Sequence, residues 1–244
     1  MINKKNEPPT RDKLLKVFSG SFLIRISYTL FGLLNSILLA RYLGNEQYGI
    51  YVFCLSIVAL LSVLTRFGMP TLVTREVAAA IVCQQWALMK GLLVRAHQFV
   101  LFISLFIIIF AGLWLYINPN SYQVEKQQAL LVSLLLIPIL SFGALRDAIL
   151  AGMRHVLLAQ MSESVIRPVL LAIGLCISIY LFPVFDGVSG VLSFYVGCSF
   201  VAFIIGWLVY IPLRPKQLIN ASVVYKSKSW FYSVVPLGFT SGMQ

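Results

Sequence analysis

Charged residues are scarce in this chain. Only 11% of its 244 residues are Asp, Glu, Lys or Arg, whereas 59% are hydrophobic. Soluble domains carry about 25% charged residues, and a chain of this length cannot enclose so much apolar surface in a core surrounded by water. The composition therefore excludes a soluble globular domain and predicts a protein whose solvent is lipid.

The residues that carry enzyme chemistry are also few. The chain has two histidines, His97 and His155, and three aspartates, and it has no Asp-x-Asp, Gly-x-Ser-x-Gly or phosphate-binding glycine-loop motif. Its four cysteines lie mostly in apolar runs and show no zinc-binding spacing. These absences argue against a metal-dependent glycosyltransferase, a histidine-based acyltransferase and an ATPase. We expect a protein that is not an enzyme and that needs no cofactor or metal.

Long apolar runs dominate what is present. A helix needs about 20 predominantly apolar residues to cross a bilayer. The chain has six such runs, at Val17–Leu39, Tyr48–Leu64, Leu93–Ile117, Ala129–Leu145, Val165–Phe182 and Val188–Leu213. They predict an all-α polytopic membrane protein in which residues 1–213 form a bundle of six transmembrane helices. Between the second and third runs, residues 71–89 predict an amphipathic helix along the cytoplasmic interface.

The C-terminal part of the chain predicts two further segments. Residues 214–229 are basic and polar, which is typical of a cytoplasmic linker, and residues 230–244 begin another apolar run that is too short to cross a bilayer. We therefore expect the start of a seventh transmembrane helix and a chain truncated within a longer protein.

The distribution of basic residues predicts the orientation. The net charge is +11, and fifteen of the 19 Lys and Arg residues fall in segments on one side of the predicted spans. Two others, Arg41 and Lys126, fall in outer loops, and Arg25 and Arg167 lie within spans. Cytoplasmic loops are enriched in Lys and Arg, so the N-terminus is predicted to be cytoplasmic. The first run is too long for a signal peptide and is interpreted as an uncleaved span.

The first span carries a polar stripe. Ser21, Arg25, Tyr28, Gly32 and Asn35 recur at steps of three and four residues, which places them on one helix face. An ionisable group in the bilayer costs about 2.5–3.5 kcal/mol on insertion scales and is a candidate functional site. Two interpretations remain open. Arg25 either snorkels to the surface as a structural residue or faces a cavity and binds an anion.

A second set of charged residues lies around the fourth and fifth spans. Glu163 and Arg167 are four residues apart, in the order that favours a helical ion pair, and Pro168 follows. The pair is either a structural salt bridge near the cytoplasmic surface or the inner rim of a polar cavity, with Glu163 holding Arg167. Arg146 and Asp147 are adjacent, and we expect one to face the bundle interior and the other the cytoplasm.

Four segments resemble one protein family. Leu39–Tyr51, Arg66–Ala78, Leu145–Arg154 and Glu163–Leu170 are similar to the polysaccharide-biosynthesis flippases, the Wzx-type oligosaccharide-lipid translocases. The resemblance implies the multidrug/oligosaccharidyl-lipid/polysaccharide exporter fold, in which two six-helix bundles face a central cavity. This chain would supply the first bundle and the start of the second. Alone, it is expected to insert in the membrane without replacing a complete flippase.

The resemblance also implies a function. Family members move an undecaprenyl-diphosphate-linked oligosaccharide across the bacterial inner membrane, for O-antigen, capsule or exopolysaccharide synthesis. Expected partners are that lipid-linked substrate, the bilayer and polysaccharide polymerase machinery, and not nucleic acid. The candidate substrate-binding residues are Arg25, Tyr28, Asn35, Arg146, Glu163 and Arg167. Three alternatives remain: a cation-coupled drug or metabolite antiporter of the same fold, a non-transporting membrane assembly partner and a polytopic glycosyltransferase.

Overall fold

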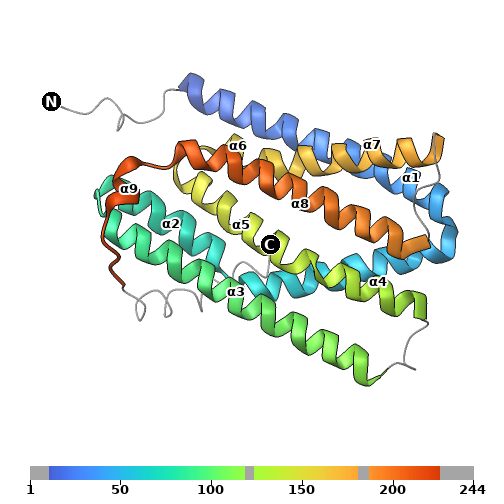
Figure 1. The fold of residues 1–244 in the computed structure, drawn as a ribbon. Helices are drawn as coiled ribbons and strands as arrows, with labels where there is room; N and C mark the ends of the chain where they lie inside the picture. The colour runs from blue at the N-terminus through green and yellow to red at the C-terminus, as the bar shows by residue number, and fades with distance from the viewer. Residues whose placement is uncertain (1–10, 119–123, 181–186, 226–244) are drawn as a thin grey trace.

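Helices make up almost all of the described structure. The computed structural model describes residues 11–118, 124–180 and 187–225, and no strand occurs in these ranges. Its helices, labelled in Figure 1, are α1 (Arg11–Arg66), α2 (Met69–Val82), α3 (Trp86–Ile117), α4 (Val124–Leu134), α5 (Leu136–Gly152), α6 (Val156–Met161), the π-helix η2 (Ser162–Ile166), α7 (Arg167–Tyr180), α8 (Gly187–Leu213) and α9 (Lys216–Asn220). The predicted all-α class is confirmed.

Helix α1 contains two of the predicted spans. Its regular geometry breaks at Gly44, whose φ of 74° and ψ of 173° are outside the helical region. That conformation is available almost only to glycine because it has no Cβ. Figure 1 shows the first half of α1 running to one end of the molecule and the second half returning. The predicted outer loop at residues 41–49 is wrong in this respect, because one glycine reverses the chain and its neighbours remain helical.

Among the described residues, five helical stretches are long and apolar enough to cross a membrane. They are Phe18–Arg66, Trp86–Ile117, Val124–Gly152, Val156–Ile179 and Gly187–Leu213. Because the first contains the reversal at Gly44, these five stretches hold nearly all residues of the six predicted runs. The third stretch continues past Leu145, where the apolar prediction stops, because Arg146 and Asp147 are accommodated inside the bundle.

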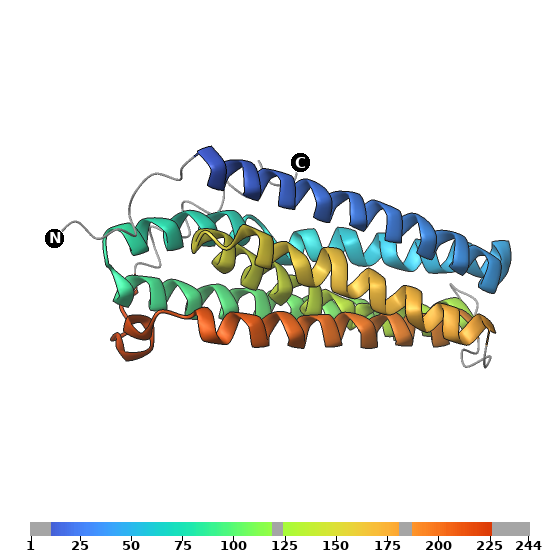
Figure 2. The same cartoon turned by 90° about the horizontal axis from the view of Figure 1, so that it is seen from above.

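The long helices lie side by side in one bundle, and the first half of α1 lies at its edge in both views (Figures 1 and 2). One core cluster joins residues of α2, α3, α5 and α8, and another joins α1, α4, α7 and α8. The segment predicted as an amphipathic helix along the interface forms most of α2, which instead runs lengthwise beside α3 (Figure 1), buries Leu72, Val73 and Val77 and packs against α5 and α3. The described part of the predicted linker forms α9 and then follows α3, where Val224 N–H donates to the carbonyl oxygen of Ala87 at 3.2 Å. The predicted seventh helix lies outside the described residues.

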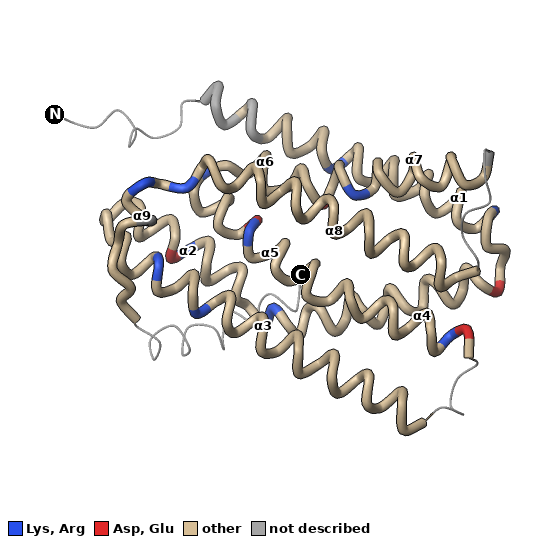
Figure 3. The backbone as a smooth tube through the Cα atoms, viewed as in Figure 1, with Lys and Arg blue, Asp and Glu red and all other residues tan. Residues whose placement is uncertain are grey.

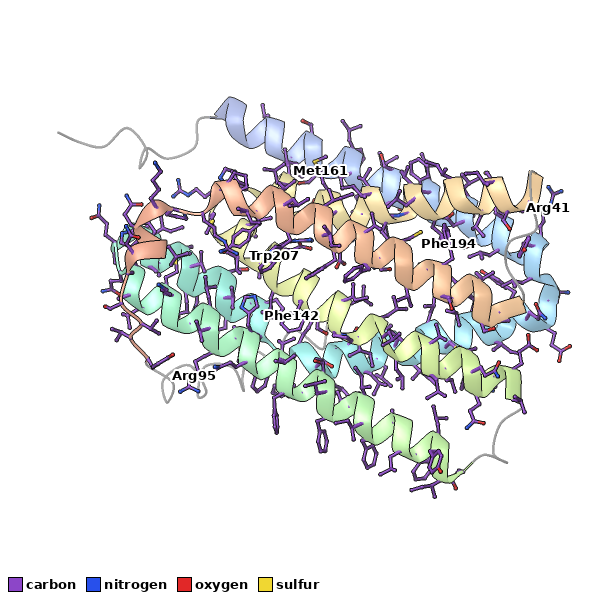
Figure 4. All side chains as sticks on the ribbon, viewed as in Figure 1. Arg41, Arg95, Phe142, Met161, Phe194 and Trp207 are labelled. Atoms are coloured by element: carbon purple, nitrogen blue, oxygen red, sulfur yellow. The ribbon has the colours of Figure 1, made fainter. Side chains whose placement is uncertain are left out.

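Basic residues gather at one end of the bundle. Figure 3 shows them around α2, α3 and α9, whereas most of the length of the helices carries no charge. Arg95, predicted to be cytoplasmic, and Arg41, predicted to be in an outer loop, lie at opposite ends of the molecule (Figure 4). This separation of the ends agrees with the predicted topology. Which end faces the cytoplasm stays a prediction.

Candidate functional site

A cavity of about 370 Å³, lined by both apolar and polar side chains, lies between both halves of α1, the start of α7 and the first half of α8. The reversal at Gly44 brings the two halves of α1 to the same cavity, with residues 28–39 from the first and 48–59 from the second. Its polar wall is formed by the side chains of Tyr28, Asn35, Ser36, Tyr48, Tyr51, Ser56, Arg167 and Tyr195. The cavity therefore offers hydroxyl groups, one amide and one guanidinium, which suits an anionic or hydroxyl-bearing ligand.

Arg167 supplies the positive charge of this wall. It is the first residue of α7, directly after the π-helix, and its guanidinium carbon lies 5.8 Å from the centre of the Tyr195 ring. Within the described ranges the ion pairs are Arg75–Glu76 and Arg146–Asp147, so no described carboxylate pairs with Arg167. Its guanidinium therefore retains donors for an anion in the cavity.

Asn35 and Tyr28 complete the part of the site that the sequence predicted. Asn35 is only 5% exposed, and its Nδ2 donates to the carbonyl oxygen of Pro168 at 3.0 Å, which ties α1 to α7. Tyr28 lies two helical turns earlier on the same face and is 46% exposed, at the rim of the cavity. The structure thus brings together Tyr28, Asn35 and Arg167, three of the six predicted residues, from distant parts of the chain.

Arg25 does not line the cavity. It lies on α1, one turn before Tyr28, and its side chain is exposed. The predicted polar stripe is correct for Tyr28, Gly32 and Asn35, which all contribute to the wall, but Arg25 extends beyond the rim. A role for Arg25 in substrate binding stays a prediction, and the residues that line the cavity do not include Arg25.

Arg146 is buried beside the cavity and has its own partners. It is 1% exposed, and its Nη2 and Nε donate to Asp147 Oδ1 at 2.6 and 3.0 Å. It also donates to Ser162 Oγ of η2 and, at 3.2 Å, to the carbonyl oxygen of Phe203 in α8. Arg146 faces the bundle interior, as expected for one of the two residues, whereas the side chain of Asp147 is 24% exposed and lines a different pocket beside Thr74 and Arg75. Arg146 connects three helices and does not line the cavity.

Glu163 and Arg167 do not form the predicted ion pair. The i,i+4 prediction assumes a regular α-helix, but Ser162–Ile166 is a π-helix, and no ion pair joins Glu163 to Arg167 among the described residues. The carboxylate of Glu163 instead packs against Gly143 of α5, where a Cβ would lie 2.5 Å from Oε1. Arg146, Glu163 and Arg167 border a separate void of about 10 Å³.

Three of the four cavity tyrosines were not predicted from the sequence. Tyr48 and Tyr51 lie one turn apart on the second half of α1, and Tyr195 comes from α8. The ring of Tyr51 lies between the other two. Its centroid is 6.3 Å from that of Tyr48 and 6.3 Å from that of Tyr195. The spacing of Tyr48, Tyr51 and Ser56 on one helix face was a signal that could have identified the second half of α1.

No metal site accompanies the cavity in the part of the chain that the structure describes, since no three His, Cys, Asp or Glu side chains there could hold a metal ion.

Comparisons with known proteins identify the family. A solved structure titled "Reverse polarity of binding pocket suggests different function of a MOP superfamily transporter from Pyrococcus furiosus" matches 90% of this chain with a TM-score of 0.68 at 15% identity, which shows a shared fold. Stage V sporulation protein B of Bacillus subtilis is 27% identical over 158 residues, or 62% of this chain. The chain spans only 49% of that transporter and 30% of the sporulation protein. The family model described as "Polysaccharide biosynthesis protein" matches residues 14–235. The chain therefore belongs to the polysaccharide biosynthesis protein family.

Proposed function

We propose that the protein takes part in moving an undecaprenyl-diphosphate-linked oligosaccharide from the inner to the outer leaflet of a bacterial inner membrane. The observation that carries this proposal is Arg167, a cation without a described carboxylate partner in the wall of a tyrosine-rich cavity that is surrounded by apolar helices. On this proposal Arg167 binds the diphosphate. Guanidinium groups bind phosphate oxygens through two parallel hydrogen bonds, which makes arginine well suited to this task.

The chemistry of such a substrate fits both surfaces of the bundle. A polyprenyl tail can remain in lipid, beside the exposed apolar side chains of α1 and α3, which include Phe22, Leu30, Phe102 and Phe106. The diphosphate and sugars cannot enter lipid without large desolvation costs and need hydrogen-bonding groups. Tyrosine hydroxyls can bond sugar hydroxyls, and tyrosine ring faces can pack against the apolar faces of sugar rings.

The size of the cavity fits one part of this substrate. Its volume of about 370 Å³ lies at the lower end of the range for small-molecule sites, which is roughly 300–1,000 Å³. An oligosaccharide needs more room. Since the chain spans 49% of the related transporter structure, we propose that the cavity is one wall of a larger central cavity and that a second bundle forms the opposite wall.

The proposal includes a biological setting. The N-terminus faces the cytoplasm, the products are O-antigen, capsule or exopolysaccharide, and polymerase machinery receives the translocated unit. The basic end of the bundle supports the orientation, because cytoplasmic segments are enriched in Lys and Arg.

The test removes the charge of Arg167 at the chromosomal locus, so that the whole gene product is made. Arg167→Gln keeps most of the side-chain length and loses the charge, and Arg167→Lys keeps the charge without the two-pronged geometry. A charged hydrogen bond is worth about 1.5–3 kcal/mol, so Arg167→Gln should reduce export about 10- to 100-fold. Arg167→Lys should lie between Arg167→Gln and wild type.

The measurements are surface polysaccharide, lipid-linked oligosaccharide retained in the inner leaflet, and protein abundance. Arg41→Gln is the matched control, because Arg41 is exposed and lies at an end of the bundle, outside the cavity wall. Normal export by Arg167→Gln at normal abundance would contradict the proposal. Loss of resistance to cationic drugs with normal export would favour the antiporter alternative instead.

A further inference from the structure

Asn35 presents an unused hydrogen-bond acceptor at the cavity wall. Its Oδ1 is buried and has no hydrogen-bond partner among the described residues, although the side chain is only 5% exposed. Buried polar atoms are nearly always hydrogen-bonded, and an exception calls for an explanation. Asn35 lines the cavity, so a molecule that occupies the cavity can supply the partner once the atoms that now cover Oδ1 move aside.

The orientation of this amide is fixed by its other atom. The carbonyl oxygen of Pro168 can only accept a hydrogen bond, so the atom 3.0 Å from it must be Nδ2, which donates. If the amide were flipped, Oδ1 would face the carbonyl oxygen of Pro168, and two acceptors would repel each other. Asn35 Oδ1 is consequently a fixed acceptor, and it selects for a donor.

The position of this acceptor relates it to Arg167. Asn35 bonds the carbonyl group of Pro168, the residue that follows Arg167, and both Asn35 and Arg167 line the same cavity. A ligand that engages both must carry a hydrogen-bond donor and an anionic group that fit together in this cavity of about 370 Å³. In a glycosyl diphosphate, the substituent nearest to the diphosphate is the one at C2 of the first sugar, next to the anomeric carbon.

We infer that Asn35 Oδ1 accepts a hydrogen bond from the C2 hydroxyl or C2 amide N–H of the sugar attached to the diphosphate, and so determines specificity for that sugar. The inference rests on the proposed function, in which Arg167 binds the diphosphate. A site built to bond a polar group rejects the analogue that lacks it, because the buried acceptor is then left without a partner.

The experiment measures the binding of three probes to the whole gene product in lipid nanodiscs by isothermal titration calorimetry. The probes are farnesyl diphosphates that carry glucose, N-acetylglucosamine or 2-deoxyglucose. Wild type should bind at least one of the first two probes about tenfold more tightly than the 2-deoxy probe. Tighter binding of the glucose probe would identify the donor as a hydroxyl, and tighter binding of the N-acetylglucosamine probe would identify it as an amide N–H.

Variants assign this discrimination to Asn35. Asn35→Leu has a similar size and no acceptor, so it should bind the three probes within about twofold of one another. Ser27→Ala is the matched control, because Ser27 lies on the same helix outside the cavity wall and its hydroxyl donates to the carbonyl oxygen of Leu23 at 2.9 Å. The control should discriminate as wild type does. If Asn35→Leu does not fold, as judged by thermal unfolding, Asn35→Ala gives the same readout.

Two failures can be distinguished. Arg167→Gln should weaken all three probes to a similar extent. Suppose that Arg167→Gln weakens the binding of all three probes. If wild type then binds the three probes equally, or if the Asn35 variants still bind the 2-deoxy probe about tenfold more weakly than the others, the proposed function stands and the inference about Asn35 is wrong. If binding depends on neither Arg167 nor the diphosphate, both the inference and the proposed function are wrong.

Discussion

Replacing Gly206 by alanine tests the packing around the buried Arg146. Gly206 lies on α8 directly against the guanidinium group of Arg146. A Cβ built on Gly206 would overlap Nη1 and Cζ of Arg146 and would lie 3.0 Å from Nη2. Either α8 or the guanidinium group must therefore move in the Gly206→Ala variant.

The size of the effect follows from how Arg146 is held. The end of an arginine side chain normally moves at little cost, but this one donates to Asp147 Oδ1, Ser162 Oγ and the carbonyl oxygen of Phe203. Moving away from α8 breaks at least the bond to Phe203, and a hydrogen bond from a charged group is worth about 1.5–3 kcal/mol. Alanine in place of glycine within a helix recovers roughly 0.5–1 kcal/mol. The expected net loss of unfolding free energy is about 1–2 kcal/mol.

The assay measures unfolding of the purified protein in mixed micelles as the fraction of a denaturing detergent is increased. Tryptophan fluorescence reports the folded fraction. Gly197→Ala is the control, because Gly197 lies on the same helix with no atom within 4 Å of the position that a Cβ would take. It should match wild type or exceed it by up to about 1 kcal/mol. In an Arg146→Met background, where a flexible side chain replaces the fixed guanidinium, Gly206→Ala should cost less than about 0.5 kcal/mol. Equal stability of Gly206→Ala and Gly197→Ala would refute the reasoning.

Three further predictions concern the reversal, the topology and the first-span arginine. Gly44→Ala should lower the unfolding free energy by about 1–3 kcal/mol, because φ of 74° with ψ of 173° strains any residue with a Cβ. Gly49→Ala is the control in the same assay and should have little effect, because the space around Gly49 is open. Cys83 is the exposed cysteine of the described chain, so a membrane-impermeant maleimide should label it in inside-out vesicles and not in spheroplasts, and the reverse pattern would invert the topology. Arg25→Ala should reduce polysaccharide export less than Arg167→Gln does, because Arg25 lies outside the cavity wall, and a loss as large as that of Arg167→Gln would make Arg25 a principal binding residue.

Much of the fold could be predicted because the bilayer imposes a simple constraint on sequence. Backbone groups in lipid must bond internally, so long apolar runs become helices, and six such runs were visible. A reversal between the first two runs was predicted, but its form, a single non-helical residue at Gly44, and the continuation of α5 past Leu145 were not visible. The first depends on one residue in an unusual conformation, and the second depends on partners of Arg146 that lie in other helices.

The cavity could be predicted only in part, because periodicity identifies a helix face but not what covers it. The stripe on the first span correctly grouped Tyr28, Gly32 and Asn35. The positions of α7 and α8 decide which residues of the stripe face the cavity. Because the sequence pattern does not contain these positions, it also included Arg25. Tyr195 reaches the cavity from α8, and no local pattern connects it with α1.

The three arginines near the site show why an anion site is a property of neighbours and not of residue type. In the sequence, Arg25, Arg146 and Arg167 are all basic residues within or next to apolar runs, and each could bind an anion. In the structure, Asp147, Ser162 and Phe203 occupy the donors of Arg146. Arg25 is exposed outside the cavity, and Arg167 lines the cavity with no carboxylate in an ion pair with it among the described residues. The cavity cation is therefore Arg167, whose guanidinium group lies beside the Tyr195 ring.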